Sequence, residues 1–194
     1  MSQRPETVPD HDVVALLLHQ HEEIRRLFAE VRTADPADRA EAFDRLRRLL
    51  AVHETAEELI VHPDARKLVP DGDLVVDAHL AEELAAKQML VELEHLGTEA
   101  ADFLPKLEEL RIAVEDHAAH EEQEEFPHLR SAHSDSRLKT MAKAVKAAEA
   151  LAPTHPHPGV ESATTNLLVG PYAAMLDRAY DVISQAIGHN ASDN

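Results

Sequence analysis

The residues best suited to chemistry in this chain are histidines and glutamates that recur at a fixed spacing. His53 is followed by Glu57 four residues later and by a proline ten residues later. His117, Glu121 and the next proline repeat this spacing. Residues four apart on a helix lie on one face, with Cβ atoms about 5–6 Å apart. Each His–Glu pair can therefore converge on one point, and the repeat indicates two such pairs.

Two further histidines, His21 and His79, each lie on the apolar face of the segment that precedes one of these pairs. The chain thus contains one hairpin motif twice, a single His followed by His-x-x-x-Glu. A buried carboxylate is costly unless it is paired or binds a metal, and no Lys or Arg occupies these inward positions. Imidazole and carboxylate without thiolate suit iron, manganese or zinc. Since these ligands are too many for one tetrahedral zinc ion, we expect two metal ions that share bridging carboxylates.

Glu83 lies in phase with His79 on the same predicted helix face. We expect it to be an extra ligand, a partner of a ligand's ring nitrogen, or a proton relay. His120 and Glu124 form another i, i+4 pair, rotated from this face, and we expect them to be peripheral. Glu54 is expected at the rim of the site. Solvated faces are expected to carry the other acidic residues nearby, which are Glu22, Glu23, Glu58, Glu122 and Glu125.

Helices are expected to position these residues, because glycine is scarce while alanine, leucine and glutamate are abundant. Apolar periodicity predicts helices over residues 12–32, 36–61, 73–96 and from 98–105 to about 131. His62-Pro63 is predicted to end the second helix, since the residue before proline disfavours helical geometry. Capping residues predict two more helices, over 135–151 and 171–187. The predicted fold is all-α, an up-down four-helix bundle with one or two additional C-terminal helices.

The 194 residues suit one domain with appendages. We expect a flexible arm over residues 1–11, the four-helix bundle over 12–131, and a helical extension over 132–190 packed on the bundle. His155 and His157 lie in a proline-rich segment of this extension. A surface loop is the favoured interpretation of that segment, and a metal-binding loop is the alternative.

The composition excludes several classes of protein. The absence of cysteine excludes disulfides, thiolate metal sites and cysteine nucleophiles. No apolar run reaches the roughly 20 residues that span a membrane, and the polar first residues are not a signal peptide. The formal net charge of −18 repels nucleic acid and anionic membranes. We therefore expect a cytoplasmic protein that acts on small molecules and binds neither nucleic acid nor membrane.

These residues resemble the hemerythrin-like family of HHE cation-binding domains, over about residues 12–130. The resemblance implies two iron ions with an oxo or hydroxo bridge, and Glu57 and Glu121 as bridging ligands. The family's metal-binding pattern falls on His21, His53, Glu57, His79, His117 and Glu121.

The sequence departs from the oxygen-carrying hemerythrins at two places. They have a second His one turn after the third-helix His, where this chain has Glu83. They end with His followed by Asp five residues later, where this chain has Glu121 four residues after His117. The pattern is more similar to mycobacterial hemerythrin-like proteins, for which the family expectation is catalase-like or nitric-oxide-linked activity.

Three functions from different classes remain open. The carboxylate-rich pattern favours a non-haem di-iron oxidoreductase that reacts with hydrogen peroxide, as a catalase or peroxidase does. The alternative is a protein that binds or senses O2, NO or iron without turnover, and it needs the same ligands. A metal-free helical interaction module is the third, and it predicts purified protein without stoichiometric metal.

Overall fold

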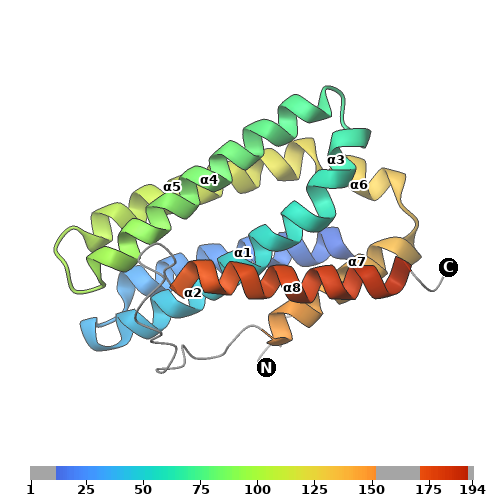
Figure 1. Cartoon of the computed structure of the whole chain (residues 1–194). Helices are drawn as coiled ribbons and strands as arrows, with labels where there is room; N and C mark the ends of the chain where they lie inside the picture. Colours follow the sequence, from blue (N-terminus) through green and yellow to red (C-terminus); the bar gives the residue numbers. More distant parts are fainter. Residues whose placement is uncertain (1–11, 152–170, 192–194) are drawn as a thin grey trace, which may run out of the picture.

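The structure is a computed structural model that describes residues 12–151 and 171–191. All its elements in these ranges are helices (Figure 1). The predicted arm over residues 1–11 and the loop with His155 and His157 lie outside the described residues. The main helices are α1 (Val13–Thr33), α2 (Pro36–Ala56), α4 (Gly72–Leu96), α5 (Phe103–Glu124), α7 (Asp135–Leu151) and α8 (Pro171–Ala191).

The predicted all-α bundle with additional C-terminal helices is confirmed. Helices α1 and α2 pack as one hairpin and α4 and α5 as another, and α1 also packs against α5 (Figure 1). Helix α7 lies against α1, and α8 lies against α2 and α7. None of the described helices has the length and apolar character needed to cross a membrane.

Local sequence signals account for three of the helix ends. Asp12 caps α1, since its carboxylate accepts a hydrogen bond from the Ala15 N–H at 2.8 Å. Pro36 lies in the first turn of α2, where its missing N–H costs nothing. Gly97 ends α4 with a φ of +79°, a conformation that favours glycine.

The predicted end of the second helix at His62-Pro63 is wrong. After α2 the chain makes a π-helical turn, Glu57–Val61, and continues as α3 (His62–Leu68). In this turn the His62 N–H donates to the carbonyl of Glu57, five residues earlier. Pro63 has no N–H and would collide with the carbonyl four residues back in a regular α-helix. The wider π-turn accommodates it, so the helix continues.

The fourth predicted helix is also interrupted. Helix α5 ends at Glu124, and α6 (Phe126–Ala132) begins two residues later with Pro127 in its first turn. Glu125, between them, has φ −107° and ψ −50°, which departs from regular helical values. A proline ten residues after the His thus alters both helices, by a π-turn in one and a break in the other.

Two apolar clusters enclose a polar layer. One cluster joins the start of α1 and the π-turn to α6, α7 and α8, and the other joins the distal parts of α1, α2, α4 and α5. On α1, His21 lies between Leu17 of the first cluster and Ile24 of the second. The bundle therefore buries its inward histidines and glutamates between two apolar layers that keep water out.

Candidate metal centre

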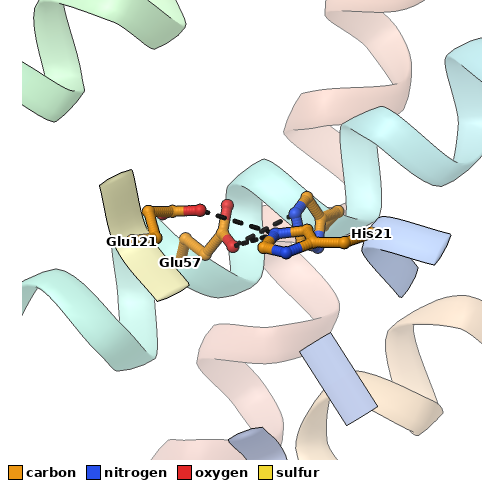
Figure 2. Close-up of side chains that lie close together, drawn as sticks. His21, Glu57 and Glu121 are labelled. Atoms are coloured by element: carbon orange, nitrogen blue, oxygen red, sulfur yellow. Dashed lines mark ion pairs between the residues drawn. The ribbon is translucent and has the colours of Figure 1, made fainter. Parts of the chain in front are cut away.

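A first group of buried ligands comes from α1, α2, the π-turn and α5. It consists of His21, His53, Glu57 and Glu121, each of which offers one atom within 4.8 Å of the others. The Nε2 atom of His21 lies 3.7 Å from Glu57 Oε1 and 3.6 Å from Glu121 Oε2. Figure 2 shows the His21 ring directed at both carboxylates. The His53 Nε2 atom lies 3.1 Å from Glu57 Oε1.

A second group shares both carboxylates with the first. It consists of Glu57, Glu83, His117 and Glu121, again with one atom each within 4.8 Å. His117 Nε2 lies 3.5 Å from Glu121 Oε1 and 4.0 Å from Glu83 Oε1. Because Glu57 and Glu121 belong to both groups, they are placed where carboxylates between two ions would lie. Glu83 is buried within this group, on the face that its phase in the sequence predicts.

His79 lies beside these two groups. It is buried and forms a third group with His62, Glu121 and Glu125. Its Nδ1 atom lies 2.6 Å from Glu125 Oε1, and its Nε2 atom lies 3.3 Å from Glu124 Oε2. Five of the six predicted ligands therefore lie together in the first two groups. The sixth, His79, is connected to them through Glu121, which also belongs to its group.

The central polar atoms have no hydrogen-bond partner among the described residues. They are Nε2 of His21, Nε2 of His117 and both carboxylate oxygens of Glu57 and of Glu121. Each buried polar atom without a partner costs about 1–3 kcal/mol. Ligands of one ion lie about 2.0–2.2 Å from it, so their mutual distances reach about 4.4 Å. The observed groups are close to that size, so the residues fit metal ions.

In three of these histidines the ring nitrogen that points away from the site forms a hydrogen bond with a polar side chain. In each case Nδ1 is engaged and Nε2 is directed into the site, an arrangement typical of metal-binding histidines. The Nδ1 contacts are His21 to Glu122 at 2.8 Å, His53 to Gln20 at 2.9 Å and His117 to Glu82 at 3.0 Å.

The contact between His53 and Gln20 continues to the C-terminal extension. Gln20 is buried, and its amide Nε2 donates to Glu149 Oε1 on α7 at 2.5 Å. With its N–H group held by Glu149, the Gln20 amide presents its oxygen to His53 Nδ1. The His53 ring then donates from Nδ1, which leaves the lone pair of Nε2 for a metal.

Burial shifts the protonation of the central groups towards their neutral forms. It raises the pKa of Glu57 and of Glu121 well above the usual range, and in each case a neighbouring carboxylate adds to the rise. Burial also lowers the pKa of His53 and of His117. Bound metal ions would compensate the negative charge of the ionised carboxylates, and would displace protons from them on binding.

Two buried residues of the region were missed or misplaced by the sequence analysis. His62 was predicted only to end a helix, and Glu125 was predicted on a solvated face, which is wrong. Their relative exposures are 3% and 0%. His62 contacts Glu125 Oε2 through Nδ1 at 3.0 Å and Glu83 Oε1 through Nε2 at 2.6 Å. The regular α-helical period hid His62, whereas Glu125 lies four residues after Glu121, a spacing that marks one face.

These contacts hold His62 as a cation between two anions. Burial by itself lowers the pKa of His62, but hydrogen bonds to Glu125 and Glu83 outweigh it and raise the pKa to about 11. Burial likewise raises the pKa of Glu125, but hydrogen bonds from His62 and His79 outweigh it and lower the pKa to about 2. Glu83 follows the same balance, and its pKa is lowered.

A lysine at the edge of the site corrects a further expectation. Lys87 on α4 is partly buried and forms ion pairs with Glu83 at 3.2 Å, with Glu54 at 3.5 Å and with Glu58. Glu54, predicted at the rim, is buried. Inward-facing Glu83 therefore has a lysine partner, whereas the ion-pair contacts of Glu57 and Glu121 among the described residues are all with histidines. His120 and Glu124, which were predicted to be peripheral, are exposed, but Glu124 contacts His79.

A small cavity lies against the histidines. Its free space is about 20 Å³, room for one water-sized molecule. Its wall is mainly apolar and comes from all four bundle helices, with Ile24, Leu50, Ala86 and Val114 beside His53 and His117. The cavity is also lined by four charged side chains, Arg25, Glu54, Glu83 and Glu115, so the site has a compartment of very limited size that is not purely apolar.

Comparison with known proteins adds three findings. A family model described as hemerythrin HHE cation binding domain matches residues 12–129. An uncharacterised hemerythrin-like protein of Schizosaccharomyces pombe is 24% identical over 172 residues, which cover 87% of this chain and 85% of that protein. A DNA nickase of Nostoc sp. is 26% identical over 141 residues, which cover 72% of this chain but 40% of the nickase. No solved structure matches the chain.

Proposed function

The chain belongs to the hemerythrin HHE cation-binding domain family, and on that premise we propose that it is a non-haem di-iron protein that reacts with hydrogen peroxide in a catalase- or peroxidase-like manner. The observation that carries the proposal is the pair of carboxylates shared by two ligand groups. All four oxygens of Glu57 and Glu121 are buried without a hydrogen-bond partner among the described residues.

The two groups suggest which residues would hold each iron ion. His21 and His53 would bind one ion and His117 the other, with Glu57 and Glu121 between them. We assign His79 to the second ion as well, because one of its atoms lies within 4.8 Å of Glu121 and because it corresponds to His21 in the repeated motif. Glu83 is the additional carboxylate of that second position.

The charge balance supports bound cations. Five carboxyl groups are buried in this region, and the ion pairs that His62 and the partly buried Lys87 form reach Glu54, Glu83 and Glu125 but, among the described residues, not Glu57 or Glu121. Buried charge without compensation is strongly unfavourable. Iron would supply the missing positive charge, together with a change of valence and open coordination positions.

The surroundings favour a very small reactant. The cavity of about 20 Å³ has room for about one water-sized molecule, which favours a reactant of a few atoms, such as O2, NO or hydrogen peroxide, over an organic substrate. The Glu83 carboxylate, 4.0 Å from His117 Nε2, is placed to hold or pass a proton at the second position.

The competing function is binding or sensing of O2, NO or iron without turnover, which the same ligands would serve. The nickase activity named for one relative receives no support here, since this chain spans 40% of that protein and carries a net charge of −18, which opposes binding to DNA. We propose that its partners are small molecules and that it acts in the cytoplasm.

Metal content tests the di-iron centre. The purified protein, loaded with Fe2+ without oxygen and desalted, is expected to retain two iron ions per chain by elemental analysis. After oxidation it should show the optical bands of an oxo-bridged iron pair. Glu121→Gln removes the shared carboxylate and should lose iron, whereas the exposed Glu109→Gln on the same helix should retain both ions. Full retention of iron by Glu121→Gln would contradict the assignment.

Peroxide turnover separates the two functions. The di-iron protein is mixed with hydrogen peroxide while oxygen evolution, or oxidation of an added reductant, is followed over many equivalents. Sustained turnover that Glu121→Gln lacks supports the enzyme. A reversible spectral change with O2 or NO, with peroxide left unconsumed, supports the binding protein and contradicts the enzyme.

A further inference from the structure

The two halves of the repeat differ at the residue before the proline. In the second half this residue is Phe126, whose ring stacks on His21 with centroids 5.6 Å apart. In the first half it is His62, whose ring lies 6.2 Å from that of His79. Each of these residues therefore lies next to the single His of the other hairpin. Phe126 places an apolar ring beside His21, whereas His62 places a hydrogen-bonding ring beside His79.

His62 links two side chains of the metal centre. Glu125 joins the rings of His62 and His79 with its two oxygens, at 3.0 Å and 2.6 Å. On its other side His62 contacts Glu83 at 2.6 Å. These residues are all buried, so the contacts form a continuous chain from His79 through Glu125 and His62 to Glu83.

The π-turn is what brings His62 to this place. Glu57 and His62 are five residues apart, and in a regular α-helix five residues turn the side chain by about 140° relative to the first. In the π-turn the fifth residue bonds back to the first, as His62 does to Glu57. Both side chains then face the core. A single local irregularity thus adds a second polar group to the face that already carries Glu57.

We propose that His62 is a positioning residue of the metal centre, which orients His79 through Glu125 and orients Glu83 directly, and so governs the ion position next to His117. The inference rests on the proposed two-ion site. On this proposal the two ion positions are not equivalent, because Phe126 contacts His21 by packing and offers it no hydrogen bond. Loss of a residue that orients ligands typically weakens metal binding about 10- to 100-fold.

The substitution His62→Phe tests the inference, since it makes the two halves of the repeat alike. Fe2+ is added without oxygen to the metal-free full-length protein, in competition with a chromophoric chelator. We expect wild-type protein to bind two ions. In His62→Phe one binding step should remain as in wild type, and the other should weaken about 10- to 100-fold. His62→Gln, which keeps an N–H donor for one carboxylate, should recover part of this loss.

His133→Phe is the matched control. His133 is partly buried and pairs with Asp64 at 2.7 Å, without a contact to the ligand groups. The His133→Phe variant should bind both ions as wild type does. If circular dichroism shows that His62→Phe does not fold, His62→Gln provides the test by itself, and we then expect one of its two Fe2+ binding steps to be weaker than in wild type.

Three outcomes would overturn the role of His62. These are wild-type affinity for both ions in the variants, equal weakening of both steps, and a control that weakens one step as much. A wild-type chain that binds no Fe2+ would instead contradict the proposed function, and this inference with it. The two failures are therefore distinguishable.

Discussion

Glu57 and Glu121 are side chains whose burial costs the metal-free protein stability. Both are fully buried, and burial raises the pKa of each well above its usual range. A carboxyl whose pKa is raised on folding favours the folded state most below its unfolded pKa, near 4.5. That contribution is lost as the pH rises through the folded pKa. Metal-free protein is therefore expected to lose stability above pH 4.5 through these two groups.

Glu121→Gln should show this cost directly. The amide is neutral and nearly isosteric, so it removes the buried ionisation. We expect the metal-free variant to unfold with a free energy about 1–3 kcal/mol higher than wild type at pH 8, and the gap to narrow towards pH 4.5. Urea unfolding followed by circular dichroism at both pH values measures it. Glu109→Gln, on an exposed position of the same helix, should show no such gap. A metal-free Glu121→Gln that is less stable than wild type at pH 8 would refute the explanation.

The main residues of the site could be predicted because their spacing matches the apolar face of regular helices. His53 with Glu57, and His117 with Glu121, keep that phase, and all four are buried. Glu125 continues the spacing from Glu121 and could have been found by the same rule. His62 could not, because its inward position depends on a π-turn that regular periodicity does not contain.

At the scale of elements, proline was the main source of error. The second helix was predicted to end before Pro63, on the premise that a missing N–H and a steric clash stop an α-helix. The fourth helix was predicted to run through Pro127 without interruption to about residue 131. In the structure Pro63 follows the π-turn and lies in the first turn of α3, and Pro127 lies in the first turn of α6. The predicted helix start at residue 36 and the predicted helix end at residue 96 agree with α2 and α4, because Pro36 and Gly97 act through their own backbone geometry.

The turn between α3 and α4 depends on the absence of a side chain at Gly72. A Cβ there would lie 2.7 Å from the carbonyl oxygens of Ala65 and Arg66, and backbone atoms cannot move aside as a flexible side chain can. We expect Gly72→Ala to lower the free energy of unfolding by about 1–3 kcal/mol. Urea unfolding of the metal-free protein measures the loss.

Asp71→Gly provides the neighbouring control. Asp71 has a φ of +54°, so glycine relieves a mild strain there without adding an atom. Its effect should stay below about 1 kcal/mol. A Gly72→Ala variant as stable as wild type would show that α3 and α4 can separate, and that the position of His79 and Glu83 on α4 does not depend on this contact.

At the scale of the whole molecule, the C-terminal extension takes part in the bundle. Helices α7 and α8 share an apolar cluster with α1 and the π-turn, through residues such as Val145 and Ile183. The extension lies beyond residues 12–129, which the family model matches. Its Glu149 nevertheless reaches the site through Gln20 and His53. The helices could be predicted from their caps, but this contact joins residues 129 positions apart, and no local pattern indicates it.

Removal of the Glu149 carboxylate should weaken the first ion position. In Glu149→Ala the Gln20 amide loses its acceptor and can turn, so His53 is held less firmly. We expect Fe2+ binding at one step to weaken by up to about 10-fold, as for other groups that orient a ligand. Glu149→Gln keeps an acceptor oxygen and should bind iron as wild type does. Chelator competition measures both variants, and identical affinities in Glu149→Ala and wild type would contradict this role.

The same contact has a consequence that runs in the opposite direction. Coupling between two equilibria is reciprocal, so a docked α7 that favours the ion must be favoured by the ion to the same degree. One coupling free energy then links metal binding to the packing of the C-terminal extension on the bundle. A helix on the outside of the bundle becomes a reporter of the centre, and amide hydrogen exchange in α7 should slow when iron binds.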